Sequence, residues 1–248
     1  MTKPEFTLIQ GDPRQPALAR LLEEAGFRTQ LLPAPEKWKY ENLPPPGTRL
    51  PVANATPTLR QAAEEQGFLL MEYGRRPDFK AENGHITAEN ALCLAMLRGT
   101  VLRNAPVLVL VYGAIGSALS QKLQALGARV WVAARKPEVL DTIGRTGCCP
   151  VPLDALEHCL PQVTLVFNTI PAMVLTKPRL ALLPQNAQVL DLTDKDIKKK
   201  YGKFSPVEGI LRAGMSNRTR PLGCVFCDAR QSNHICFFWE SIVSRQHA

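Results

Sequence analysis

The stretch of sequence that decides the fold is APVLVLVYGAIGSALSQKLQALGARVWVAAR, from Ala105 to Arg135. Residues 107–111 form an unbroken apolar run, as expected of a strand buried on both faces of a parallel sheet. Leucines three or four residues apart predict a helix over residues 117–126, and Gly127 stands where a helix commonly ends. Residues 130–133 predict a second buried strand. The stretch therefore predicts the strand–helix–strand unit of a doubly wound, Rossmann-type sheet.

The turn between the predicted strand and helix carries two of the three glycines of the dinucleotide-binding fingerprint. Gly113 would let the backbone approach a diphosphate, and Gly116 would let the helix pack close to the strand. Val111 occupies the first glycine position, where a β-branched residue resists positive φ values. We expect a dinucleotide diphosphate to lie against Gly113, Ala114, Ile115 and Gly116, at the N-terminus of the helix. A sheet of the same kind that binds no nucleotide is the alternative.

The residues after the second strand indicate which dinucleotide would bind. NAD enzymes usually place Asp or Glu there, to accept hydrogen bonds from the ribose, whereas this chain has Arg135 followed by Lys136. A guanidinium carries a permanent positive charge, and its geometry matches the oxygens of a 2′-phosphate. The sequence therefore predicts NADP rather than NAD, the alternative being an exposed basic pair that only ends the strand.

Composition and charge are those of an ordinary cytoplasmic enzyme. No apolar run is long enough to span a membrane and no apolar signal region follows Met1, so we expect a cytoplasmic protein without a membrane partner. Seven cysteines without paired spacing through most of the chain indicate free thiols in a reducing compartment. The net charge is +8, but most of the excess lies after Thr193, so the main body does not point to nucleic acid.

An N-terminal α/β domain is predicted over residues 1–85, beginning with a strand at residues 6–9 and a helix. Arg14 and Gln15 lie in the loop between them, at the strand edge where ligands of open α/β sheets bind. Arg14 would hold a substrate carboxylate through two hydrogen bonds, or would simply be solvated. A proline-rich stretch, residues 31–57, is predicted to be an extended loop.

A connecting helix is predicted over residues 86–103, with its apolar period over residues 86–97. Thr87 and Glu89 are expected at its exposed N-terminal end, where they would face the cleft between the domains or act only as caps. The dinucleotide-binding domain then covers residues 104–192. The predicted fold class is α/β: two small α/β domains, the second a Rossmann-type doubly wound parallel sheet, with an atypical C-terminal tail.

A polar loop ends the fourth predicted strand, residues 163–167. Asn168, Thr169 and Ile170 follow this strand, and Pro171 fixes the backbone beyond them. The loop leaves the same edge of the sheet as the glycine turn. We therefore expect it to line the nicotinamide–ribose side of the cofactor.

The tail, residues 193–248, has no helical period and carries Cys224-x-x-Cys227 and then His234-x-Cys236. Thiolates and imidazole suit zinc, but this spacing is not that of a familiar zinc finger, so no metal is predicted. Its basic and aromatic residues form no recognisable nucleic-acid module, and no nucleic acid is predicted as a partner. We interpret the tail as a divergent or out-of-frame C-terminus.

A set of short motifs resembles the A subunit of dipicolinate synthases. The motifs are YGRRPDFK at residues 73–80, TAENA at 87–91, VYGAIG at 111–116, GARVWVAAR at 127–135, NTIPA at 168–172 and VLDL at 189–192, with GDPRQ at 11–15. Each is short, but their order and spacing make the resemblance specific over roughly the first three quarters of the chain.

The resemblance implies an NADP-dependent oxidoreductase that oxidises a dihydrodipicolinate-type ring to pyridine-2,6-dicarboxylate. It implies that the partner is a flavoprotein B subunit and that the location is the mother cell of a spore-forming bacterium, and it leaves homo-oligomerisation open. Arg14, Gln15, Thr87 and Glu89 would bind the dicarboxylate substrate. No residue stands out as the general base.

The sequence departs from the family pattern at three places. Val111 and Asn90 stand where the family has glycine, and the Pro-Gly-Gly turn that follows the VLDL motif is absent. The family's next strand and its returning helix are therefore expected to be missing, which would weaken cofactor binding. Two other functions stay open: a non-catalytic Rossmann scaffold that binds the B subunit, and an NADP enzyme of the shikimate dehydrogenase type.

Overall fold

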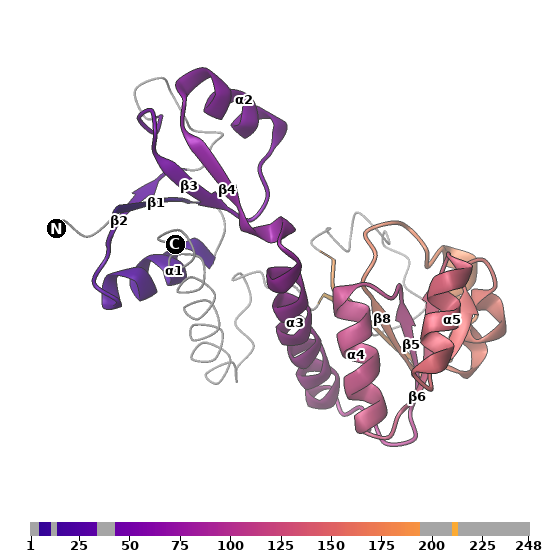
Figure 1. Cartoon of the computed structure of the whole chain (residues 1–248). Helices are drawn as coiled ribbons and strands as arrows, with labels where there is room; N and C mark the ends of the chain where they lie inside the picture. The colour runs from indigo at the N-terminus through magenta and orange to yellow at the C-terminus, as the bar shows by residue number, and fades with distance from the viewer. Residues whose placement is uncertain (1–4, 11–13, 34–42, 194–209, 213–248) are drawn as a thin grey trace. The chain divides into compact units, whose positions relative to one another are not determined.

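The chain divides into two compact α/β units, and Figure 1 labels many of their helices and strands. Of the residues that the structure describes, those up to Lys80 belong to one unit and those from Ala81 onward belong to the other. The structure, a computed structural model, describes residues 5–10, 14–33, 43–193 and 210–212. None of the helices in these ranges is long and apolar enough to cross a membrane.

Two strand–helix–strand units build the first of these parts, and the strands of each pair are parallel. They are β1 (Glu5–Ile9), α1 (Arg14–Glu24) and β2 (Arg28–Leu32), then β3 (Arg49–Val52), α2 (Pro57–Gln66) and β4 (Leu69–Glu72). β3 lies inside the stretch predicted to be a loop, and that prediction is wrong there. Leu50 and Val52 of β3 are buried with Leu59 of α2. This apolar packing stabilises the strand and outweighs the low strand propensity of the prolines in the stretch.

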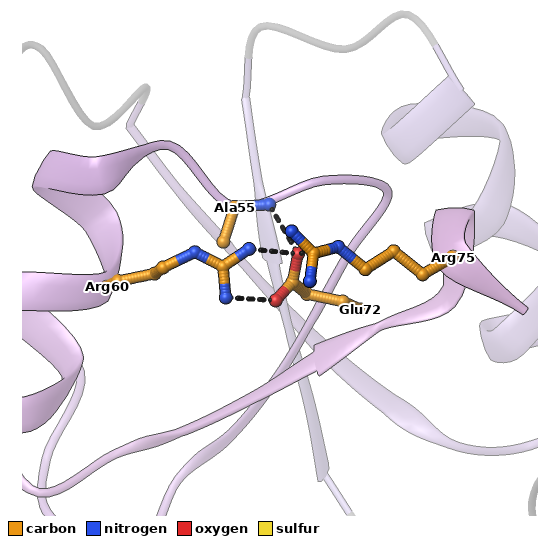
Figure 2. A network of polar contacts seen from close by, with 4 residues as sticks. All are labelled: Ala55, Arg60, Glu72 and Arg75. Atoms are coloured by element: carbon orange, nitrogen blue, oxygen red, sulfur yellow. Dashed lines mark hydrogen bonds and ion pairs between the residues drawn. The ribbon is translucent and has the colours of Figure 1, made fainter.

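A carboxylate at the end of β4 holds three segments of the first unit together. Figure 2 shows Glu72 between Arg60 of α2 and Arg75 of the short 3₁₀ helix η3 (Tyr73–Arg75). Arg60 reaches both carboxylate oxygens, at 2.5 and 2.7 Å, and Arg75 lies at 3.4 Å. The backbone amide of Ala55 donates to the same group at 3.1 Å. The Arg60 hydrogen bond, followed by that of Ala55, lowers the pKa of Glu72.

The long helix α3 spans Pro77–Leu97 and so begins nine residues before the start predicted at residue 86. Pro77 occupies the first helical position, where its missing amide costs no hydrogen bond. Gly84 lies inside the helix although glycine disfavours helix interiors. A Cβ at Gly84 would come within 2.7 Å of the carbonyl oxygen of Ala114, so close packing explains the glycine.

The second unit is built on a six-stranded parallel sheet in the order β10-β9-β8-β5-β6-β7. This is the Rossmann order, with β5 in the centre, and it confirms the predicted fold class. Its strands are β5 (Pro106–Leu110), β6 (Arg129–Ala134), β7 (Cys149–Pro152), β8 (Leu165–Asn168), β9 (Gln188–Asp191) and β10 (Ile210–Arg212). Its other elements are α4 (Ala114–Ala125), α5 (Pro137–Arg145), the 3₁₀ helices η4 (Leu156–His158) and η5 (Leu160–Gln162), and α6 (Lys177–Leu180).

Both faces of this sheet are covered, as the unbroken apolar run of β5 predicts. Val107 and Val109 lie in the core formed with α3, α4 and α5 on one face. Leu108 and Leu110 lie in the core formed with η4, η5 and α6 on the other. Alternate residues of one strand thus face opposite layers, which is why the strand carries no polar residue.

The strand that was expected to be missing after β9 is present. Residues 210–212 form β10, which pairs in parallel with β9 and opposes Arg212 to Asp191. The expectation of a sheet that ends at β9 is therefore wrong, because the chain reaches the next position of the sheet without the family's Pro-Gly-Gly turn. The returning helix and the Cys224, Cys227, His234 and Cys236 cluster fall outside the described residues.

Replacing Glu72 by Gln leaves two arginines around a neutral amide, so we expect the melting temperature at pH 7 to fall, by the equivalent of about 1–3 kcal/mol. Folding lowers the pKa of Glu72 below its value in the unfolded chain. The stabilisation that the ionised carboxylate provides is therefore present above the unfolded-state pKa, and it is lost as the pH falls through the folded-state pKa. The difference between wild type and Glu72→Gln should therefore shrink between pH 5 and pH 3. Glu64→Gln, on the exposed side of α2, is the control and should change little; an equal effect of both variants would contradict this account.

Candidate functional site

The turn after β5 has the shape that a glycine normally provides. Val111 adopts a φ of 74°, in the left-handed region that a β-branched residue avoids. Its amide donates to the carbonyl oxygen of Ala133 on β6 at 3.0 Å, so the residue still belongs to the hydrogen-bonding pattern of the sheet. The missing first glycine has therefore not changed the path of the turn, although it strains the backbone at Val111.

The two glycines of the turn have different surroundings. A Cβ at Gly116 would lie 2.0 Å from the carbonyl oxygen of Val111, so only glycine lets α4 approach β5 this closely. A Cβ at Gly113 would meet nothing within 4 Å, and the φ of Gly113 is −96°, which any residue adopts. The protein's own packing therefore requires Gly116 but leaves open space in front of Gly113.

Among the residues that the structure describes, nothing pairs with the first backbone amides of α4 at this open face. Gly113 is the N-cap and no side chain caps the helix, while Ser117 makes the first intrahelical bond, to the carbonyl oxygen of Gly113. The amides of Ala114, Ile115 and Gly116 precede that bond and have no partner within the helix. With the helix dipole they form a site that suits a diphosphate.

Arg135 directly follows β6 and is exposed. Within the part of the chain that the structure describes, no hydrogen bond or ion pair holds its guanidinium. Lys136 is also exposed and forms the N-cap of α5. Arg135 is thus free to contact an anion at the carboxyl end of β6, the position where the ribose of a dinucleotide lies in this fold.

The loop after β8 uses its polar side chains inside the protein. Asn168 is 1% exposed and donates from Nδ2 to Oδ2 of Asp191 at 2.8 Å. Thr169 donates to the carbonyl oxygen of Leu110 at 2.7 Å. Pro171 is exposed and Ile170 half-buried, so these two residues form the outer part of the loop. The loop is next to the glycine turn because β8 and β5 are neighbours in the sheet.

The four residues expected to bind substrate lie in two units. Arg14 begins α1, and Gln15 is buried and donates to the Tyr73 hydroxyl at 3.5 Å. Thr87 is not at a helix start, because α3 begins at Pro77; its hydroxyl donates within α3, to a backbone carbonyl at 2.6 Å.

Glu89 lies in the middle of α3, not at its N-terminal end. It pairs with Lys122 of α4, with 2.9 Å between Oε1 and Nζ. This ion pair links the two helices that cover the same face of the sheet.

Sequence reasoning overlooked two residues that shape this region. Gly84 permits the contact between α3 and the start of α4. A glycine inside an apolar helical pattern could have indicated such a close contact from the sequence. Asp191 is fully buried at the end of β9, and a carboxylate closing an apolar strand was the signal there.

Neither histidines nor cysteines of the described residues form a reactive centre at this edge. His85 lies in α3 and His158 in η4, and among the described residues no side-chain hydrogen bond joins either of them to the strand-end loops. Cys93, Cys148, Cys149 and Cys159 are free thiols, and burial raises the pKa of Cys159 to about 11. Among the described residues, no group of three acidic, His or Cys side chains could hold a metal ion.

No family model matches the chain. Among curated proteins, the chain is 27% identical over 166 residues to the A subunit of dipicolinate synthase from Bacillus subtilis. This match covers 66% of the chain but only 56% of that relative, so little more than half of the relative's length is matched.

Solved structures show the same fold. The dipicolinate synthase A subunit of Bacillus halodurans has a TM-score of 0.73 at 20% identity, with 98% of both proteins covered. The corresponding Bacillus subtilis protein has a TM-score of 0.72 at 21% identity, covering 99% of this chain and 98% of that one. D-lactate dehydrogenase of Escherichia coli follows at 0.56 and 12%, covering 76% and 74%. The chain is therefore similar in sequence to the dipicolinate synthase A subunit, the resemblance that its motifs indicated, and it shares the fold of that subunit.

Proposed function

We propose that the chain is an NADP-dependent oxidoreductase whose cofactor binds at the carboxyl edge of β5, β6 and β8. The observation that carries the proposal is the open face at Gly113, beside the uncapped N-terminus of α4. A glycine that the protein's own packing does not require, next to unpaired amides, is explained by a ligand that approaches the backbone there. The Rossmann strand order supports the proposal, because this turn follows the central strand β5 and sheets of this kind bind dinucleotides where the strand order reverses.

Each part of the edge would contribute one interaction. The amides of Ala114 and Ile115 bind the diphosphate, and Arg135 binds the 2′-phosphate of the adenosine ribose. Ile170 and Pro171 pack against the nicotinamide ribose. Bound NADP⁺ supplies the hydride acceptor, and the protein holds it in position.

For the substrate we propose a dihydrodipicolinate-type ring, oxidised to dipicolinate. The support is homology to a protein named for dipicolinate synthesis and the motifs shared with it. Arg14 would receive a carboxylate of this substrate, at the edge of the first unit, whereas Gln15 is buried and bonded to Tyr73 and would have only a secondary part. Thr87 and Glu89 make bonds within α3 and to α4, so we give them only a secondary part in substrate binding.

A flavoprotein B subunit is the partner that we propose, and the cytoplasm of the mother cell in a spore-forming bacterium is the proposed location. Both proposals derive from the same resemblance. The scaffold alternative derived chiefly from Val111 and from the altered tail. Because Val111 adopts the φ of a glycine and β10 joins the sheet, neither departure now favours a site without cofactor.

Replacing Arg135 by Ala tests the choice of cofactor. We expect NADPH affinity to fall about 10- to 100-fold, the loss of a charge-assisted contact, while NADH affinity changes by less than about threefold. Nicotinamide fluorescence on titration measures both. Arg129→Ala is the matched control, since Arg129 is exposed at the opposite end of β6 and should leave both affinities unchanged. Equal losses for NADPH and NADH would contradict the role of Arg135, and no binding of either by the wild type would favour the scaffold.

Gly113→Ala tests whether a ligand occupies the open face. The new methyl group meets nothing in the protein, so the melting temperature should stay within a degree or two of wild type. NADPH affinity should nevertheless fall at least about tenfold, because the methyl group takes the place of the diphosphate. Gly144→Ala in α5 is the control: its Cβ would lie 3.9 Å from Pro150, and it should leave NADPH binding intact. Full NADPH affinity in Gly113→Ala would rule out a diphosphate at this turn.

A further inference from the structure

Three neighbouring strands of the second unit end side by side. In the sheet register, Leu110 of β5 opposes Asn168 of β8, and Asn168 opposes Asp191 of β9. Both polar residues are buried, with Asn168 1% and Asp191 0% exposed. A buried carboxylate is costly unless it is hydrogen-bonded, so this pair needs an explanation beyond the strand pattern.

Each oxygen of the Asp191 carboxylate has its own donors. Oδ1 accepts the amide of Thr193 at 2.9 Å and the hydroxyl of the same residue at 2.5 Å. Oδ2 accepts Nδ2 of Asn168 at 2.8 Å. A carboxylate can only accept, so it forces the NH₂ group of Asn168 to face β9. The orientation of the Asn168 amide is therefore determined by Asp191.

The other end of the Asn168 amide fixes the loop. With its NH₂ group toward Asp191, its Oδ1 faces the loop and accepts the backbone amide of Ile170 at 3.3 Å. Thr169 is fixed separately through its bond to the carbonyl oxygen of Leu110. Asp191 thus sets, through one side chain, the path of the loop that ends at Pro171.

We propose that Asp191 is a positioning residue of the dinucleotide site, acting through Asn168 to place Ile170 and Pro171 against the nicotinamide half of the cofactor. Asp191 itself touches no ligand. The inference rests on the proposed function, since it concerns how that same site is shaped.

The hydrogen-bond logic makes the two single substitutions defective in different ways. In Asp191→Asn, the new amide keeps its oxygen toward Thr193 and turns its NH₂ group toward that of Asn168, so two donors meet. Relief requires inversion of Asn168, which then presents its NH₂ group to the amide of Ile170. In Asn168→Asp, two carboxylates face each other across the 2.8 Å contact.

The exchanged pair restores each of the bonds described above. In Asn168→Asp/Asp191→Asn, residue 191 accepts from Thr193 through its oxygen and donates through its NH₂ group to the new carboxylate. That carboxylate still accepts the amide of Ile170. The exchange changes neither the net charge nor the side-chain volumes.

The experiment measures the binding of NADPH and of 2′,5′-ADP, which lacks the nicotinamide and its ribose, to the wild type, both single variants and the exchanged pair. Each single variant should lose NADPH affinity at least about tenfold while 2′,5′-ADP affinity changes less than about threefold. The exchanged pair should bind NADPH within about threefold of wild type. Thr193→Val, which keeps the Asn168–Asp191 contact, is the control and should bind both ligands normally.

Several outcomes would overturn the proposal. Equal losses for both ligands in the single variants would indicate general structural damage, and unchanged NADPH binding would remove the role of Asp191. If the single variants do not fold, the exchanged pair decides: a soluble pair that binds NADPH normally supports the proposal, and an insoluble or non-binding pair refutes it. A wild type that binds neither ligand would refute the proposed function and, with it, this inference, whereas normal wild-type binding with no rescue refutes the inference alone.

Discussion

The close approach of α4 to the end of β5 determines the rest of the second unit. The carbonyl oxygen of Val111 occupies the space that a Cβ at Gly116 would need, at 2.0 Å. This contact sets where α4 begins, so it also sets where the unpaired amides of Ala114 and Ile115 lie. α3 is then placed on α4 by a second glycine contact, between Gly84 and the carbonyl oxygen of Ala114. Backbone packing, more than side-chain chemistry, therefore builds this edge of the sheet.

The strained Val111 shows how strongly the surroundings impose this turn. A β-branched residue at a φ of 74° costs of order 1–3 kcal/mol. The residue is held on both sides, because its amide bonds to Ala133 and its carbonyl oxygen lies against Gly116. The preceding residues 107–110 are fully buried, and burying four such side chains stabilises the fold by several kcal/mol. The stabilisation from this buried core thus exceeds the free-energy cost of the strained backbone at Val111, and the turn keeps its shape without the usual glycine.

The sequence predicted the parts of the fold that depend on local pattern and overlooked those that depend on tertiary contacts. β5, α4 and β6 were predictable because apolar residues recur regularly along each of them, and because Gly127 or a polar residue marks where the pattern stops. The true start of α3 was not, because Gly84 weakens a helical pattern and its compensation is a contact with Ala114 that no local rule contains. Likewise, Asn168 was recognisable as a strand-end polar residue, but its partner is set by the register of β8 and β9. β10 was overlooked because the family's turn sequence before it is absent.

The buried polar pair at the strand ends bears on how such a site would recognise a ligand. Asn168, Thr169 and Asp191 all direct their polar atoms to other protein groups, which leaves the outer surface of the edge to backbone amides, Ile170 and Pro171. Backbone amides bind any diphosphate with little selectivity, and apolar contacts distinguish ligands by their shape more than by their chemical groups. On the proposed function, discrimination between dinucleotides would therefore fall to Arg135, the exposed cation at the end of β6. A division of this kind, with a fixed polar interior and one charged contact outside, lets cofactor preference change at a single position without disturbing the sheet.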